Sequence, residues 1–314
     1  MGKITVEEKS YGTWGKCVRI SNGTVELYAT VEIGPRIIRF GTIGGPNIFF
    51  ENTERDIGKF ESGMDFFGKG EKWYIYGGHR LWHAPEAFPR TYLPDNYPVK
   101  YEFTENGVRL IPNALKQIGT QNEMEISMDE DGGVNVIHKV TNIGAWDIKL
   151  APWAISVLAH GGVEVVPLSD RDTDLLSNRN LILWPYTKID DERVRWHDRY
   201  VMLETSSKPG GADGKNAFKF GTNNVDGYMM YFNNNNLFVK YFDYEDGAEY
   251  PDYGCNYETY TNTSFIECES LGKLQVLKPE ETATHTERWK LFTDVAKPEN
   301  TDDIENAVKK YIEK

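Results

Sequence analysis

The sequence lacks the features of disulfide-rich, zinc-binding and membrane-spanning proteins. It has three cysteines, Cys17, Cys255 and Cys268, and none of them stands in a Cys-x-x-Cys or Cys/His spacing. An odd number of isolated cysteines indicates neither a disulfide framework nor a structural zinc site. No apolar run approaches the roughly 18 residues of a membrane span, and the N-terminus lacks the basic-then-apolar order of a secretory signal. We therefore expect a cytoplasmic protein.

Positive charge is also scarce. The chain has 35 Lys and Arg against 48 Asp and Glu, which gives a net charge of −13 and a pI near 5.0. A surface of this sign repels phosphate backbones and anionic lipids. We expect neither a nucleic acid nor a membrane as a partner.

Several catalytic motifs are missing as well. The sequence has no Gly-x-Ser-x-Gly elbow, no phosphate-binding loop, no Gly-x-Gly-x-x-Gly after a strand and no His-Glu-x-x-His. His79 and His83 would present two ligands on one face only in a helix, and the glycines before and Ala84-Pro85 after them oppose a helix. We expect no metal site and no cofactor.

What the sequence does contain is β-structure. Short runs rich in Val, Ile, Tyr, Phe and Thr alternate with turn residues throughout the 314 residues. Asn-Gly pairs at 22–23 and 106–107, and Asp-Gly-Gly at 131–133, predict hairpins. The four asparagines at 233–236 predict a turn, and the polar stretch 206–216 predicts a surface loop. No linker divides the chain, so we expect one domain over residues 1–314.

Only the C-terminal tail has a helical period. One face of residues 301–313 carries Ile304, Ala307, Val308, Tyr311 and Ile312, with acidic residues at the start and lysines toward the end. The predicted class is therefore all-β with a short, docked C-terminal helix.

The densest chemical cluster lies at residues 72–86. It combines His79, Arg80, His83 and Glu86 with four aromatic side chains, Trp73, Tyr74, Tyr76 and Trp82. Aromatic rings bind the apolar faces of sugars, while Arg, His and carboxylates bond sugar hydroxyls, so this mixture favours a carbohydrate pocket. The alternative is that the rings form core and the histidines are structural.

A second cluster, at residues 249–270, contains Asp252, Glu258, Glu267 and Glu269. In a strand, Glu267 and Glu269 share one face with Phe265. Two nearby carboxylates raise at least one pKa, which suits a general acid or base. The alternative, which periodicity alone favours, is a strand that turns these glutamates to solvent and buries its other face.

A third segment places Arg193 and Arg195 beside Trp184, Tyr186 and Trp196. Two guanidinium groups can clamp hydroxyls, carboxylates or a sugar phosphate. The separate histidines His138, His160 and His285 are expected to be structural or exposed.

Three blocks, at residues 34–52, 124–162 and 265–292, resemble the galactose-mutarotase-like superfamily, which includes the aldose 1-epimerases. Residues 77–86 and 184–193 are similar to a bacterial branch of that superfamily. The resemblance implies a large antiparallel β-supersandwich.

In the epimerases a glutamate on a late strand removes the proton of the anomeric hydroxyl, and a histidine protonates the ring oxygen. The resemblance assigns the glutamate to Glu267, but the family histidine falls at Ala151. His79 or His83 is the candidate replacement. Arg80 is expected to contact a sugar oxygen and Trp82 and Trp153 to stack on the ring; further candidate sugar contacts are Glu86, Arg193, Asp252, Glu258 and Glu269.

The sequence thus predicts a carbohydrate-binding protein that exchanges sugar anomers, as an aldose 1-epimerase does. Two alternatives remain: a non-catalytic carbohydrate-recognition domain, and a glycosidase or lyase on the same fold, because carboxylates are plentiful. The expected partner is a sugar or sugar derivative. Which sugar it is, whether it is phosphorylated, and the oligomeric state are left open.

Overall fold

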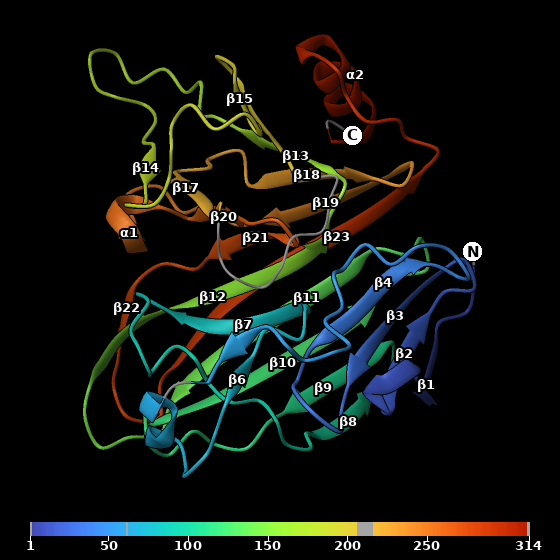
Figure 1. Ribbon diagram of the computed structural model, residues 1–314, viewed down its shortest axis with the longest axis vertical. Helices are drawn as coiled ribbons and strands as arrows, with labels where there is room; N and C mark the ends of the chain where they lie inside the picture. Colours follow the sequence, from blue (N-terminus) through green and yellow to red (C-terminus); the bar gives the residue numbers. More distant parts are fainter. Residues whose placement is uncertain (1, 61, 206–215, 313–314) are drawn as a thin grey trace.

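Two large antiparallel sheets make up the protein (Figure 1). The computed structural model describes residues 2–60, 62–205 and 216–312. The first sheet has the order β1-β2-β3-β4-β7-β12-β21-β20-β17-β14, with β22 also paired to β12, and the second has the order β15-β16-β13-β18-β19-β23-β11-β10-β9-β8. The predicted β-supersandwich is confirmed. Except for residue 216, the predicted loop at 206–216 lies outside the described residues.

The strands of the first sheet are β1 (Thr5–Ser10), β2 (Lys16–Ser21), β3 (Val25–Thr30), β4 (Ile37–Thr42), β7 (Gly78–Ala84), β12 (Ile148–Ala159), β14 (Ile182–Leu183), β17 (Phe218–Thr222), β20 (Tyr257–Thr261), β21 (Phe265–Leu271) and β22 (Gln275–Leu277). Those of the second sheet are β8 (Lys100–Thr104), β9 (Gly107–Ile111), β10 (Thr120–Met128), β11 (Val134–Asn142), β13 (Val163–Pro167), β15 (Val194–Trp196), β16 (Tyr200–Glu204), β18 (Tyr228–Asn233), β19 (Asn236–Phe242) and β23 (Thr282–Thr293). A small separate sheet pairs β5 (Gly58–Lys59) with β6 (Trp73–Tyr74), and the short helices are η1 (Gly12–Trp14), η2 (Ser62–Phe66) and α1 (Pro251–Gly254).

Tight turns join neighbouring strands where the sequence predicts them. The Asn-Gly pairs connect β2 to β3 and β8 to β9, and residues 129–133 connect β10 to β11. Asn234 and Asn235, between β18 and β19, have φ values of 49° and 56°, the left-handed region that asparagine tolerates better than most residues. The predicted hairpins and the asparagine turn are confirmed.

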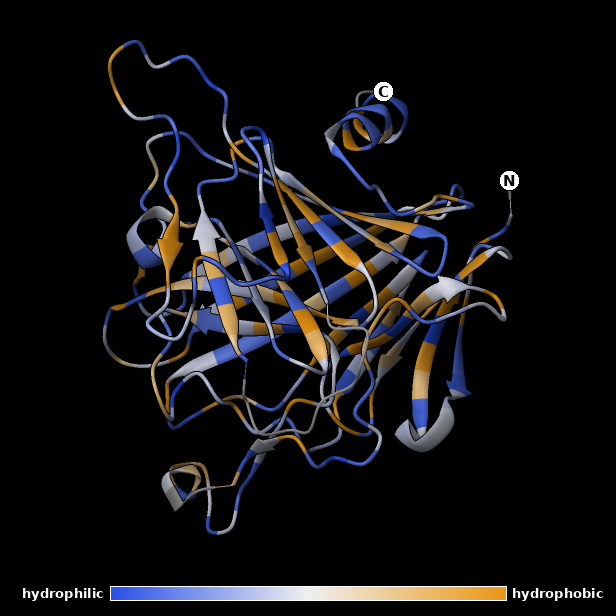
Figure 2. Ribbon diagram, turned by 45° about the horizontal axis from the view of Figure 1, so that its top comes forward, coloured by the Kyte–Doolittle hydropathy of each residue, from blue (hydrophilic) through white to orange (hydrophobic). Residues whose placement is uncertain are grey.

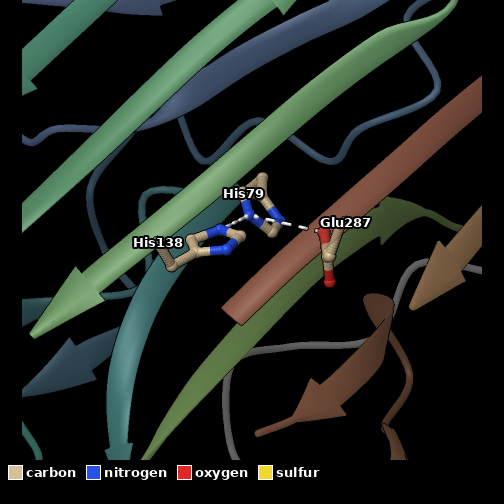
Figure 3. Close-up of side chains that lie close together, drawn as sticks. All are labelled: His79, His138 and Glu287. Carbon is tan, nitrogen blue, oxygen red and sulfur yellow. Dashed lines mark hydrogen bonds and ion pairs between the residues drawn. The ribbon is translucent and has the colours of Figure 1, made fainter. Parts of the chain in front are cut away.

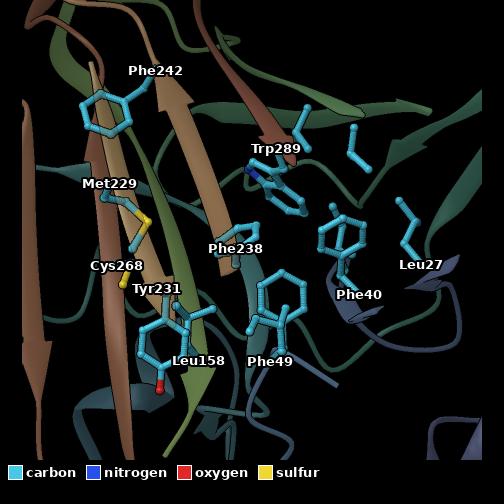
Figure 4. Packing of buried hydrophobic residues seen from close by; sticks show 14 of the residues in the cluster. Leu27, Phe40, Phe49, Leu158, Met229, Tyr231, Phe238, Phe242, Cys268 and Trp289 are labelled. Atoms are coloured by element: carbon cyan, nitrogen blue, oxygen red, sulfur yellow. The ribbon is translucent and has the colours of Figure 1, made fainter. Parts of the chain in front are cut away.

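Hydrophobic residues from both sheets pack together in the core (Figure 4). Along the strands, hydrophobic and hydrophilic residues alternate (Figure 2). In β10 and β11 every second residue is buried, as expected of strands with one covered face. Trp289 is fully buried and contacts Phe40, Phe49 and Phe238, with ring centroids 5.7 to 5.9 Å apart. Burying each of these rings contributes roughly 1.5–3 kcal/mol, so this aromatic cluster adds substantially to the packing of the two sheets.

The predicted C-terminal helix is α2 (Thr301–Tyr311). The side chain of Asn300 caps it by accepting a hydrogen bond from the backbone N–H of Asp303 at 3.0 Å. Ile304, Ala307 and Val308 pack with β13, β16, β18 and β19 of the second sheet. Among the helices in the described ranges, none has the length and apolar character needed to cross a membrane.

A polar network lies buried between the sheets (Figure 3). His79 Nε2 is 2.7 Å from His138 Nε2, and His79 Nδ1 is 2.9 Å from Ser156 Oγ. Glu287 accepts hydrogen bonds from Ser270 at 2.6 Å and from Trp289 at 2.9 Å, and it forms an ion pair with Lys240 at 2.9 Å. A third histidine, His285, lies 2.6 Å from the Ser270 hydroxyl.

The hydrogen bonds fix the tautomers of these histidines. His138 Nδ1 lies 3.1 Å from the His285 carbonyl oxygen, which can only accept, so Nδ1 carries the proton. In neutral His138, Nε2 then accepts from His79 Nε2, and His79 Nδ1 accepts from the Ser156 hydroxyl. Because the Ser270 hydroxyl donates to Glu287, His285 Nε2 donates to Ser270. The network is complete with neutral imidazoles.

Burial keeps these imidazoles neutral. It lowers the pKa of His138 and of His285 to about 3 and that of His83, also enclosed between the sheets, to about 4, while the pKa of His79 falls well below its usual value. The unfolded chain therefore binds more protons than the folded one below about pH 6.5. The histidines accordingly make stability decrease as pH falls through that value toward 4.

We predict that His83→Gln reduces this pH dependence. Glutamine retains an N–H for Asn122, which His83 contacts at 2.7 Å, but takes up no proton. The loss of unfolding free energy between about pH 7 and pH 5 should be smaller than in the wild type by about 2 kcal/mol, measured by urea unfolding at both values. His160→Gln, at a partly exposed position, is the control. An equal loss in all three proteins would contradict the prediction.

Candidate functional site

The candidate site lies on the face of the first sheet that points away from the second sheet, beside a separate buried hydrophobic cluster that includes Trp82 and Trp153. In the register, Ile155 of β12 lies opposite Arg80 of β7 on one side and opposite Glu269 of β21 on the other. Glu269 in turn lies opposite Glu258 of β20. Because paired residues of antiparallel strands point to the same side, one face collects polar and aromatic side chains from five strands: Arg80, Trp82, Trp153, Glu267, Glu269, Glu258, Tyr260 and Lys219.

Arg80 and Glu267 form an ion pair across this face. Arg80 Nη2 donates to Glu267 Oε1 at 3.0 Å, and the two residues are 187 positions apart in the sequence. The guanidinium group lies over Trp82, 4.4 Å from the ring centroid, and 5.4 Å from that of Trp73. Arg80 is 2% exposed, yet its Nε and Nη1 have no partner, and neither has the indole N–H of Trp73. These buried donors are available to an acceptor-rich ligand.

Lys219 forms a second charged group with two glutamates. Its Nζ is 2.7 Å from Glu258 and 3.0 Å from Glu269, and the Trp153 indole N–H donates to Glu269 at 2.9 Å. The ammonium group lies between two indole rings, 4.7 Å from the centroid of Trp153 and 4.6 Å from that of Trp184. The three charged residues are at most 5% exposed. They form a dehydrated triad of one cation and two carboxyl groups.

This environment changes the pKa values of all three groups. Burial raises the pKa of Glu269 to about 7, against the opposing charge of Lys219, and raises that of Glu258 well above its usual value. Burial alone would lower the pKa of Lys219, but the charges of Glu258 and Glu269 outweigh it and raise that pKa well above the usual value. The triad therefore keeps its lysine charged, and its two carboxyl groups retain protons to higher pH than exposed glutamates do.

Tyrosines surround the less buried end of the site. Glu267 keeps 12% of its side chain exposed. The Tyr92 hydroxyl donates to Glu86, and burial, together with the charges of Glu86 and Glu267, raises the pKa of Tyr92. Tyr186 and Tyr260 contact each other edge to face at 6.4 Å. Phenol rings and carboxylates thus lie around Glu267.

A cavity of about 230 Å³ flanks β7. Arg80 and Trp82 line it together with side chains such as Asp95 and Asn122. Its volume is below the roughly 300 Å³ at which sites for drug-sized ligands begin, which suits a smaller molecule. Arg80 therefore contacts both this cavity and the carboxylate of Glu267.

The structure corrects the predicted position of the two histidines. Alternation along β7 directs Arg80 and Trp82 outward, so His79 and His83 point into the protein, where they are at most 1% exposed. His79 belongs to the buried network, and His83 contacts Asn122. The expectation that an early histidine meets Glu267 on the same face is therefore wrong, and neither histidine is placed to protonate a ligand there.

The alternative interpretation of the second cluster is also wrong. Glu269 is 1% exposed, and Ile266 and Cys268 on the opposite face of β21 are fully buried as well. The strand is covered on both sides, so Glu269 does not face solvent, and Glu267 keeps only 12% of its side chain exposed. Asp252 of α1 lies close enough to Glu258 for its charge to add to the rise of the Glu258 pKa.

Three other predicted residues have different surroundings from those expected. Trp82 and Trp153 belong to the site but are at most 7% exposed, and their rings are covered by Arg80 and Lys219. They support the charged groups instead of offering a free face to a sugar. Arg193 is held by Asp191, with N–O distances of 2.9 and 2.8 Å, and bonds the Asn262 carbonyl; it joins surface segments and contacts neither charged group.

Lys219 and Trp184 were not identified as site residues from the sequence. The pattern Phe218-Lys219-Phe220 contains a signal, because both phenylalanines are fully buried in the core and the lysine between them must point outward. What the pattern does not contain is the position of β17 beside β20, which brings Lys219 to the glutamates.

His79, His138 and Glu287 have their donor atoms within 4.8 Å of one another, the one group of metal-ligand type found in residues 2–60, 62–205 and 216–312. Each donor atom already has a hydrogen-bond partner, and Lys240 lies 2.9 Å from the carboxylate. A cation would have to break these bonds beside an ammonium group. The donor set therefore fits a hydrogen-bond network better than a metal centre.

Comparison with known proteins identifies the fold. No protein-family model and no curated protein matches the sequence. Among solved structures, a galactose mutarotase-like protein from Lactobacillus casei aligns over 88% of this chain and 100% of its own, with 11% identity and a TM-score of 0.51. A galactose mutarotase-like protein from Clostridium acetobutylicum aligns over 93% and 99%, with 12% identity and a TM-score of 0.50.

A third structure extends this likeness to a longer protein. A TPR-domain containing protein from Parabacteroides distasonis has a TM-score of 0.61 at 12% identity, covering 90% of this chain and 48% of its own. All three alignments cover most of this chain. The chain thus has the fold of the galactose-mutarotase-like proteins, as its three sequence blocks predict.

Proposed function

We propose that the protein binds a sugar at the Arg80–Glu267 pair and exchanges its anomers. The observation that carries this proposal is the pair itself: a partly exposed carboxylate bonded at 3.0 Å to a buried guanidinium group with two unused N–H groups. Sugars present many oxygen acceptors, which the free N–H groups of Arg80 can bind. They also have an acidic anomeric hydroxyl, whose proton Glu267 can accept. The solved structures with this fold that are named galactose mutarotase-like support the same function.

In the proposed reaction Glu267 acts as the general base. It takes the proton from the anomeric hydroxyl of the bound aldose; the C1=O bond forms as the bond between C1 and the ring oxygen breaks, and the ring oxygen takes up a proton from an acid. Rotation about C1–C2 and the reverse steps give the other anomer. Arg80 would bind a sugar oxygen and hold Glu267 in place. Proton transfer from a positioned group typically contributes 10²–10⁴-fold.

Glu267→Gln tests the role of the base. The amide keeps the size of the side chain but accepts no proton, so anomer exchange of aldoses such as glucose and galactose should slow by about 10²–10⁴-fold. The measurement is magnetisation exchange between the two anomeric proton signals by NMR. Glu249→Gln, which changes an ion-paired glutamate with a 63% exposed side chain, is the control. Equal exchange rates for wild type and Glu267→Gln on every aldose would remove the enzymatic proposal.

A second candidate function is sugar recognition without catalysis. It is favoured by the burial of His79 and His83 and by Ala151, which is fully buried where the family has its histidine. Under this alternative the same pair binds the sugar, but no proton transfer follows.

Binding and exchange, measured on the same variants, separate the two functions. Arg80→Lys removes the planar N–H groups and should weaken sugar binding about tenfold or more, because charged hydrogen bonds contribute about 1.5–3 kcal/mol each. Isothermal titration with each aldose gives the affinity. Without catalysis, Glu267→Gln should bind like the wild type, and neither should exceed the rate of exchange in buffer. Wild-type exchange well above that rate would exclude the non-catalytic function.

A further inference from the structure

The proposed reaction needs an acid, and the triad of Lys219, Glu258 and Glu269 is placed to supply one. Within the described part of the chain, no histidine hydrogen-bonds or pairs with Arg80 or Glu267. The triad lies on the same face and contains the neighbour of the base: Glu269 is two positions from Glu267 in β21, about 7 Å along the strand. That spacing allows one carboxyl group to reach the anomeric hydroxyl while the other reaches the ring oxygen of the same sugar.

The charges of the triad favour a retained proton. One ammonium group lies within 3.0 Å of two carboxyl groups, and all three residues are nearly excluded from water. Two ionised carboxylates so close together, with one cation, would leave an uncompensated negative charge in a dehydrated site, which is costly. One proton bound by the two carboxyl groups removes that charge, as in pairs of carboxyl groups that hold a single proton tightly.

We infer that Glu269 is the proton donor of the proposed anomer exchange, in place of a histidine, with Lys219 and Glu258 as positioning residues. This inference rests on the proposed function. Glu269 Oε2 accepts from the Trp153 indole at 2.9 Å, which fixes the carboxyl group and leaves Oε1 for the transferable proton.

Both groups that exchange protons with the sugar then lie on β21. Glu267 gains the proton of the anomeric hydroxyl, and Glu269 gives its own proton to the ring oxygen as the ring opens. On reclosure the ring oxygen returns a proton to Glu269, and Glu267 returns one to the anomeric oxygen. No oxidant, reductant or second substrate is needed.

Other titratable and charged groups also act on Glu269. They are Glu267 of β21, Glu258 and Tyr260 of β20, Lys219 of β17, Tyr186 of the segment after β14 and, from the second sheet, Glu164 of β13. Arg80 of β7 pairs with Glu267, and Asp252 of α1 acts on Glu258. Since the pKa of Glu269 is raised to about 7, the acid form is lost as the pH rises through that value. The rate of exchange should therefore fall on the alkaline side of neutrality.

The experiment measures anomer exchange of glucose and galactose by NMR against pH for wild type, Glu269→Gln and Lys219→Met. Glu269→Gln should slow exchange by about 100-fold or more and lose the alkaline decline, while changing the affinity for the sugar far less. Lys219→Met removes the cation that favours ionised carboxyls, so its alkaline decline should move to higher pH. Glu249→Gln and Lys149→Met, from an exposed pair with N–O distances of 2.6 and 2.7 Å, should match the wild type.

The outcomes distinguish this inference from the proposed function. If Glu267→Gln is inactive but Glu269→Gln keeps the wild-type rate and pH profile, the donor is wrong and the function stands. If the wild type does not exceed the buffer rate, both fail. Should Glu269→Gln not fold, infrared spectra of Glu164→Gln decide, because this variant removes the other buried carboxyl group whose pKa is raised to about 7. A buried carboxylic acid band that disappears with the rate as pH rises supports the inference, and its absence at about pH 6 overturns it.

Discussion

The alternation of side chains along five paired strands is the constraint on which the site depends. In β7, β12, β21, β20 and β17 each residue lies opposite a partner that points the same way, so a single register separates two rows of polar groups. The inner row joins His79 to the core, and the outer row joins Arg80 to Glu267. A shift of one residue in β7 alone would exchange these rows, placing a histidine on the outer face and burying a guanidinium group among the aromatic rings of the core. The dense hydrophobic packing around Trp289 opposes such a shift, and so the core that holds the sheets together also determines which groups meet on the outer face.

The two rows differ in how their charges are compensated. In the inner row His79, His138 and His285 form hydrogen bonds with one another or with neutral groups, and the carboxylate of Glu287 receives an ammonium, a hydroxyl and an indole donor. Such a network resists change and suits a structural role. The outer row is incomplete: Arg80 has unused N–H groups, and Lys219 faces two carboxyl groups. An enclosed group with unused donors or an excess of one charge lowers its free energy by binding a ligand or a proton. The contrast is a physical reason to seek chemistry on the outer face, although the inner row has more histidines.

The sequence predicts the fold better than the site. The hairpins depend on residues close together in the sequence, whereas the site depends on the pairing of strands that are far apart in it. Hairpins form from local signals, and the Asn-Gly turns and the capped helix α2 were predictable from a few residues each. The three family-like blocks extend this to the large antiparallel β-supersandwich. The site requires the pairing of β17 with β20 and of β7 with β12, which are distant in sequence. The alternation that correctly placed Glu267 and Glu269 on one face would also have separated His79 from Arg80, but an aromatic and basic cluster in a short stretch suggested that all its members share one pocket. Lys219 has no motif at all, and only the sheet order reveals its partners.

The absence of a histidine at position 151 is connected to the rest of the outer face. Ala151 lies opposite Ala84 in the register, and these two small side chains are adjacent to Trp153 and Trp82, whose rings meet edge to face at 5.5 Å. A bulky imidazole at 151 would compete with those rings for space. The Trp153 ring in turn directs its N–H to Glu269 and covers Lys219. The same packing that leaves no room for a family-like histidine therefore fixes the carboxyl group beside Glu267. Under the proposed mechanism the acid is therefore Glu269 of β21 instead of a histidine of β12. Trp153 lies two residues from Ala151 in β12, and its indole N–H donates to Glu269.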